Sequence, residues 1–220
     1  MSREHWNRRY GEAGLLWSAT PSRFVVAEVG DLPPGRALDL ACGEGRHAIW
    51  LAERGWQVTG VDFADVALAR AARLAAARAV EVDLVHADLL GWEPPARAFE
   101  LVLVLYLQLP AHERRRVLAG AAEALAPGGT LLVVGHHLAN LTEGHGGPSD
   151  AAVLCTEDDV AAELPGLAVE RAERVLRPVE GAPRAAVDLL VRARRPLPAR
   201  RGSGRAPSSR RAAGDGSRGR

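Results

Sequence analysis

The chain has 220 residues, a length that fits one domain. Hydrophobic residues make up 47% of it, which is enough for a core, and no apolar run is long enough to predict a membrane span. The charged N-terminus lacks the apolar region of a secretory signal, and two cysteines, Cys42 and Cys155, suggest no disulfide framework. These features predict a cytoplasmic protein.

Charge is unevenly distributed along the chain. Residues 196–220 contain seven arginines and one aspartate and show no apolar periodicity, which predicts a disordered, Arg-rich tail. Because the whole chain has a formal net charge of +1, the rest of it is net acidic. We therefore expect no nucleic-acid binding by the body of the protein, and at most a weak contact through the tail.

The order of predicted elements indicates the fold class. Two short helical pieces are expected within residues 4–31, and strands and helices alternate from residue 36 onward. The predicted strands are 36–41, 56–62, 80–88, the first part of 98–109, and 129–137; the predicted helices are 45–54, 63–79 and 110–125. Alternation of near-continuous apolar strands with helices indicates a parallel sheet covered by helices on both faces.

The last third breaks this alternation. Residues 136–155 are rich in Gly and His and predict a long loop, followed by a helix at 156–164 with Thr156 as its N-cap. Two further strands, 167–178 and 184–196, are joined by a short turn and predict an antiparallel pair. The expected fold is therefore α/β, a Rossmann-like doubly wound sheet of seven strands, mostly parallel with a C-terminal antiparallel strand, and helices on both faces.

The segment LDLACGEGRHAIWLAERG, residues 38–55, places two glycines between a strand and a helix, where a ligand can touch the backbone. It fits the dinucleotide fingerprint G-x-G-x-x-G poorly. With Gly43 as the second glycine, the third position is Arg46, where close packing needs no side chain; with Gly43 and Gly45 first, Ala48 comes third, late relative to the strand. This disfavours NAD.

Asp39 at the end of that strand points to another ligand. A carboxylate there would repel a pyrophosphate but suits an ammonium group. A ligand with an ammonium, a ribose and an adenine but no phosphate is S-adenosylmethionine. The pattern Asp39-x-Ala41-x-Gly43-x-Gly45 resembles the glycine-rich turn of class I S-adenosylmethionine-dependent methyltransferases, in which it holds the methionine and ribose end of the cofactor.

Further motifs of this family follow in order over residues 35–195. VTGVD ends at Asp62, where the resemblance implies a carboxylate that binds both ribose hydroxyls. Phe63 would pack on the adenine, Asp88 at the end of VHAD would accept from its amino group, and the backbone N–H of Leu89 would face the ring. The cofactor-binding residues implied in this way are Asp39, Ala41, Gly43, Gly45, Arg46, Asp62, Phe63, Asp88, Leu89, Leu105 and, from the N-terminal segment, Trp17.

Each acidic residue also has a plainer interpretation. Asp39 and Asp62 would serve as caps for the helices that follow them, and Asp88 as an exposed loop residue. All three, however, lie at the carboxyl ends of predicted strands, where open α/β sheets bind ligands.

The acceptor is expected to be a small molecule. The Asn/Asp-Pro-Pro-aromatic motif of methylases that act on DNA or protein amino groups is absent from LYLQLP, residues 105–110. The segment HWNRRYGEAGLLWS is similar to the N-terminal segment of the tellurite-resistance and thiopurine-type branch, which closes over the cofactor. This resemblance divides the chain into a helical lid segment (1–34), a methyltransferase domain (35–195) and the tail (196–220).

His136 and His137, at the end of the fifth strand, are the candidate general bases, with polar loop residues as the alternative. Tyr106 follows the fourth strand, where it would contact the acceptor or the methionine moiety, or simply pack. Arg46 would bind a carboxylate of the cofactor or the acceptor. The histidines and Cys155 match no standard metal spacing, so no metal is expected.

Other functions stay open at this point. They are an RNA methyltransferase anchored by the basic tail, a non-catalytic cofactor-binding module and, least favoured, an NAD-dependent enzyme. A monomer or a homodimer is expected.

Overall fold

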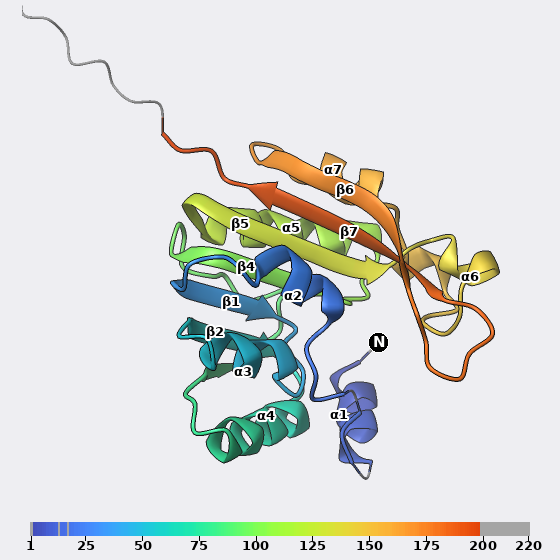
Figure 1. Ribbon diagram of the computed structural model, residues 1–220, viewed down its shortest axis with the longest axis horizontal. Helices are drawn as coiled ribbons and strands as arrows, with labels where there is room; N and C mark the ends of the chain where they lie inside the picture. Colours follow the sequence, from blue (N-terminus) through green and yellow to red (C-terminus); the bar gives the residue numbers. More distant parts are fainter. Residues whose placement is uncertain (1, 13, 17, 199–220) are drawn as a thin grey trace, which may run out of the picture.

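A seven-stranded sheet organises the chain (Figure 1). The computed structural model describes residues 2–12, 14–16 and 18–198. The strand order is β3-β2-β1-β4-β5-β7-β6, and β7 runs antiparallel to both β5 and β6, whereas the other described pairs are parallel. The strands are β1 Arg36–Leu40, β2 Gln57–Asp62, β3 Asp83–His86, β4 Phe99–Leu105, β5 Leu125–His136, β6 Ala168–Arg177 and β7 Ala186–Arg194. The predicted doubly wound, mostly parallel α/β fold is confirmed.

Helices cover both faces of the sheet, as Figure 1 shows, with α2 and α3 in front of it and α5 and α7 behind. The described helices are α1 Arg3–Gly11, α2 Arg23–Val29, α3 Arg46–Ala52, α4 Asp65–Ala77, α5 Ala111–Ala124, α6 Asn140–Glu143 and α7 Glu157–Ala162, with a 3₁₀ turn, η1, at Ala151–Val153. None of them is long and apolar enough to cross a membrane.

The central strand β4 shows why two cores form. Its side chains alternate, so that Leu101 and Leu103 pack with α2 and α3, whereas Val102 and Val104 pack with α5 and α7. Every side chain from Leu101 to Leu105 is buried, which explains the continuous apolar run that predicted this strand.

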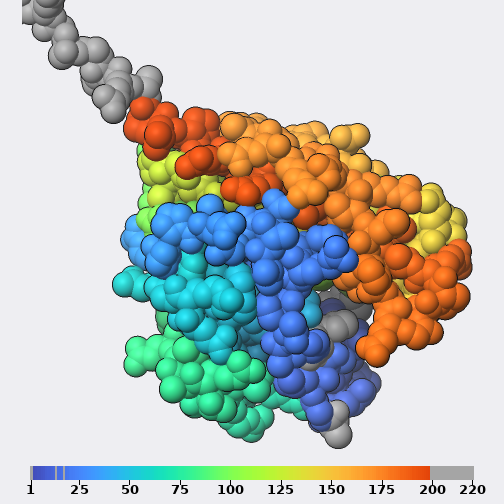
Figure 2. Space-filling view, viewed as in Figure 1, coloured from blue at the N-terminus to red at the C-terminus, as the bar shows by residue number. Residues whose placement is uncertain are grey.

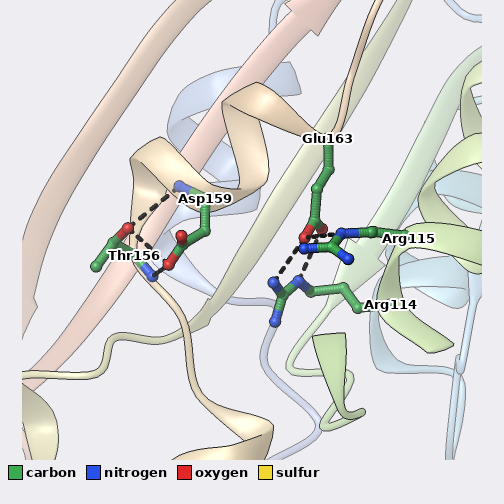
Figure 3. A network of polar contacts seen from close by, with 5 residues as sticks. All are labelled: Arg114, Arg115, Thr156, Asp159 and Glu163. Carbon is green, nitrogen blue, oxygen red and sulfur yellow. Dashed lines mark hydrogen bonds and ion pairs between the residues drawn. The ribbon is translucent and has the colours of Figure 1, made fainter. Parts of the chain in front are cut away.

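A polar network behind the sheet joins α5 to α7 (Figure 3). Thr156 and Asp159 form a reciprocal capping box at the start of α7, at the N-cap predicted from the sequence. At its other end, Glu163 accepts two hydrogen bonds from Arg114, at 2.9 and 2.8 Å, and one from Arg115. The half-buried bidentate pair fixes the end of α7 against α5.

Two segments differ from the expectation. The strand predicted from residue 129 begins at Leu125, because Leu125 pairs with Phe99. The register then shifts over Gly128 and Gly129. The stretch predicted as a loop at 136–155 contains α6, η1 and a bridge between His137 and Cys155. Buried Asn140 holds this stretch by accepting from Val187 N and donating to Gly146 O. Most of the predicted tail lies outside the described residues.

Candidate functional site

A cavity of about 1250 Å³ opens at the carboxyl ends of β1, β2 and β4. This is where parallel α/β sheets bind ligands, on either side of the point at which the strand order reverses. The lining also includes the N-terminal segment, the loop after β5 and the end of β6. Figure 2 shows the N-terminal segment, in blue, lying across the lower half of the molecule beside the orange β6–β7 turn. The volume exceeds that of a typical single-ligand site, so there is room for two small molecules.

The turn after β1 needs its glycines. Gly43 and Gly45 have φ angles of 56° and 77°, in the left-handed region that favours glycine. A Cβ on Gly43 would lie 2.8 Å from the Tyr10 hydroxyl of α1, and one on Gly45 would lie 3.0 Å from Ala71 of α4. Gly43 therefore keeps the cavity wall open beneath α1, and Gly45 allows α3 to pack on α4.

Asp62 ends β2 and lines the cavity. Its Oδ2 accepts from Gly43 N at 2.8 Å and its Oδ1 from Ala64 N at 2.9 Å, so it connects the glycine turn to the start of α4. Burial raises the pKa of this carboxyl, and these two N–H groups oppose the rise. Each oxygen retains a further lone pair, and the side chain can therefore accept two more hydrogen bonds.

Asp39 lies behind the glycine turn, and neither it nor Gly45 lines the cavity. The residue is 1% exposed, and its Oδ2 has no hydrogen-bond partner among the described residues. Burial raises the pKa of Asp39 to about 7, although the positive charge of Arg46 acts in the opposite direction. A buried oxygen without a donor is unusual and suits a cationic ligand group nearby.

The other cofactor candidates lie along the β2–β3 side and the end of β4. Phe63, Asp88, Leu89 and Leu105 line the cavity together with Ala41 and Arg46. Asp88 is exposed, and its Oδ1 accepts from Leu90 N at 2.9 Å. Trp17, which the sequence also predicted, lies outside the described residues.

The structure separates the two candidate histidines. His136 lines the cavity, whereas His137 does not. The Nδ1 of His137 accepts from Ala139 N at 2.9 Å, and its Nε2 lies 3.0 Å from a Glu157 carboxylate oxygen. His137 therefore connects the end of β5 to α7, and only His136 is placed to meet a ligand.

A fully buried carboxylate, Asp188 of β7, organises the cavity wall around His136. Its Oδ2 accepts from the Tyr106 hydroxyl at 2.8 Å and from Arg177 Nε at 2.7 Å. His136 Nδ1 is 3.2 Å from Oδ1, at ion-pair distance but outside hydrogen-bond geometry. Burial raises the pKa of Asp188, but these three neighbours outweigh it and hold the pKa below its usual value.

Sequence reasoning missed Asp188 and Arg177. A lone aspartate within the apolar run AAVDLLV was the available signal, because a charge in a buried strand needs a partner. Nothing in the sequence pairs it with Arg177 of β6 or Tyr106 after β4, since only the sheet order brings these strands together. Tyr106 has a φ of +53°, a backbone strain that the surrounding contacts maintain.

The remaining candidate residues, Cys42, Cys155 and His145, are less suited to a role in binding or catalysis. Burial raises the pKa of Cys42 well above its usual value and that of Cys155 to about 11, so both stay thiols at neutral pH. His145 is exposed on the cavity rim. Within the described ranges, no three His, Cys, Asp or Glu side chains gather as a metal site.

Comparison with known proteins agrees with this geometry. Residues 37–129 match the family described as a methyltransferase domain. A demethylmenaquinone methyltransferase of Thermus thermophilus is 41% identical over 103 residues, covering 46% of this chain and 47% of that protein. A trans-aconitate 2-methyltransferase of Sinorhizobium fredii is 37% identical over 116 residues, covering 51% and 43%. The chain thus spans about half the length of the curated relatives it matches.

Among solved structures, the N-methyltransferase NodS from Bradyrhizobium japonicum, in complex with S-adenosylhomocysteine, shares the fold with a TM-score of 0.67. The identity is 20%, over 88% of this chain and 98% of that one. The family match and the relatives show a likeness to methyltransferases over about half of the chain, and the NodS structure shows a shared fold.

Proposed function

We propose that the protein transfers a methyl group from S-adenosylmethionine to a small-molecule acceptor. The observation that carries this proposal is one cavity, bordered on one side by the glycine turn and Asp62 and on the other by Tyr106, His136 and Arg177. The first side suits an adenosyl cofactor, and the second provides groups that orient an acceptor. The methyltransferase relatives named for demethylmenaquinone and trans-aconitate support a small acceptor.

The residues present fit the cofactor. Asp62 would accept both ribose hydroxyls with its remaining lone pairs, and the open backbone at Gly43 would lie against the methionine end. The orphaned Oδ2 of Asp39 lies behind the turn, where it would attract an ammonium group without lining the cavity. Phe63, Asp88 and Leu89 would bind the adenine, and Ala41, Gly45 and Leu105 complete the proposed cofactor set, whereas Arg46 is left for the acceptor. Helix α1, which packs beside α4 through an Asn7–Asp65 hydrogen bond of 2.5 Å, would act as the lid.

When bound, S-adenosylmethionine supplies an activated methyl group on a sulfonium. The acceptor's lone pair forms the new bond to this carbon while the carbon–sulfur electrons stay on sulfur. The chain's own contribution is to hold the reacting atoms in line and to exclude water. For an acceptor that loses a proton, His136 is the proposed base, because it lines the cavity and its Nδ1 lies 3.2 Å from a carboxylate oxygen of Asp188.

The finer assignment, to the tellurite-resistance and thiopurine-type branch, remains a proposal supported by the N-terminal segment. Three further points are proposals as well. They are the division of the chain into segments after residues 34 and 195, the cytoplasmic location, and the monomeric or homodimeric state.

Calorimetric titration of the full chain with S-adenosylmethionine, S-adenosylhomocysteine and NAD tests the proposal. We expect micromolar binding of both adenosyl ligands and none of NAD. Binding of NAD, or of none of the three, would contradict it. Production of S-adenosylhomocysteine with a panel of small acceptors then separates an enzyme from a non-catalytic binding module.

A further inference from the structure

Two arginines line the cavity without a full set of partners, Arg46 beside the glycine turn and Arg177 on the acceptor side. Arg46, at the start of α3, is half-buried and makes no ion pair or hydrogen bond with any described residue. Arg177, at the end of β6, uses its Nε for Asp188 and Tyr106. Its two terminal nitrogens, with four N–H groups, have no partner in the part of the chain that the structure describes.

The two guanidinium groups line the same cavity. The charge of Arg177 opposes protonation of Arg46, in addition to the larger effect of burial, so both lower the pKa of Arg46. Asp39, whose charge acts on Arg46, makes no ion pair with it and has a pKa of about 7. Burying an unpaired charge is costly, which points to a ligand that compensates it.

Among the described acidic residues that line the cavity, none makes an ion pair with Arg46 or Arg177. Glu44 and Glu53 each pair with an arginine in or at the end of α4. Asp150 accepts from Ala152 N at 2.9 Å, within its own loop. The terminal N–H groups of Arg177 and the guanidinium of Arg46 are therefore available to a ligand in the cavity, and the Arg177 guanidinium lies next to the Tyr106 ring.

We propose that the acceptor is an organic acid whose carboxylate is bound by Arg177 and Arg46. The terminal N–H groups of a guanidinium suit the two oxygens of a carboxylate. Asp188 holds Arg177 in place through Nε and leaves its outer edge for the ligand. This inference rests on the proposed function, since it names the substrate class of the same site.

The competing source of a carboxylate is the methionine end of the cofactor, and the test separates the two. The full chain, saturated with S-adenosylhomocysteine, is titrated by calorimetry with tricarballylate, malonate and benzoate, and with the corresponding neutral amides. The variants are Arg46→Met, Arg177→Met and Arg177→Lys. Arg174→Met is the matched control, since Arg174 lies on the same strand, pairs with exposed Glu143 and lies outside the cavity lining.

We expect at least one of the acids to bind and its amide not to, with affinity that falls at least tenfold in Arg46→Met and in Arg177→Met and weakens with salt. Arg177→Lys, which keeps the charge and spares Asp188, should retain part of the affinity, and Arg174→Met all of it. Affinity for S-adenosylhomocysteine should change less than twofold in every variant.

Equal binding of acid and amide, or acid binding unaffected by both arginine variants, would overturn the inference. So would a tenfold loss of S-adenosylhomocysteine affinity in Arg46→Met, because the guanidinium would then belong to the cofactor. Failure of the unmodified chain to bind S-adenosylhomocysteine at all would instead contradict the proposed function, and is read from a separate titration.

Discussion

The two sides of the cavity are built differently. The side formed by β1, β2 and β3 offers carboxylates and backbone groups on turns that directly follow each strand, such as Gly43 and Asp62. The side formed by β4, β5 and β6 offers an imidazole, a phenol and a guanidinium gathered around one buried carboxylate, Asp188. The first suits a fixed cofactor of mixed polarity, and the second suits an acceptor that differs from one enzyme to the next.

The largest expected effect falls on the cofactor side. Asp62→Ala removes both proposed ribose hydrogen bonds, each worth about 1.5–3 kcal/mol to a charged group, so S-adenosylhomocysteine affinity should fall roughly 100-fold or more. Calorimetry measures this. Asp83→Ala, which removes an exposed carboxylate from the neighbouring strand β3, is the control and should bind normally. Unchanged affinity in Asp62→Ala would place the ribose elsewhere.

The second expected effect is a pH dependence of the free energy of unfolding that arises from Asp39 on the cofactor side. The folded-state pKa of Asp39 is about 7, above its ordinary value near 4. The folded protein therefore holds a proton that the unfolded chain releases, and the free energy of unfolding should fall as pH rises from about 4 to 7, by roughly 3 kcal/mol in total. Asp39→Asn should remove this slope in urea denaturation series.

The titration of His47 changes the free energy of unfolding with pH in the opposite direction. The test of Asp39 is therefore the difference in that free energy between the unmodified chain and Asp39→Asn. Burial, together with Arg46, lowers the pKa of His47 to about 3, and its Nε2 accepts from Ser22 N. Its stabilising contribution is present above about pH 6.5 and is lost as pH falls toward 3. A pH-independent difference between Asp39→Asn and the unmodified chain would show that the Asp39 carboxyl titrates normally.

On the acceptor side, Asp188→Asn should destabilise the protein by about 2 kcal/mol at pH 7, since it leaves a partly exposed Arg177 unpaired. The pKa of Asp188 is held low, so the stabilisation exists above pH 4 and disappears as pH falls below the ordinary carboxyl pKa. S-adenosylhomocysteine affinity should be unchanged. A large loss of that affinity would mean that the two sides are not separate.

The smallest effect is expected away from the cavity. Glu163→Gln weakens the bidentate pair with half-buried Arg114 behind the sheet and should cost about 1 kcal/mol in urea denaturation, with no change in ligand binding. Weaker ligand binding in this variant would show that α7 influences the cavity.

The same contrast explains what the sequence alone could predict. The cofactor side follows from local patterns, because Gly43 lies four residues after Asp39 and Asp62 ends its own strand. The alternation of apolar strands with helices along the chain likewise predicted the parallel sheet. The acceptor side depends on β7 inserting between β5 and β6, which places Asp188 beside Arg177 and His136, and no local pattern carries that order. The sequence also offered no way to distinguish His136 from His137. The structure distinguishes them, because the side chain of His137 lies against Glu157.

A crystal structure of the full chain with S-adenosylhomocysteine tests this account most directly. We expect the ribose hydroxyls within hydrogen-bond distance of Asp62, and the sulfur directed at the space between Tyr106, His136 and Arg177. A ligand whose sulfur points away from that space, or whose ribose lies on the β4–β6 side, would contradict the division of the cavity into a cofactor side and an acceptor side.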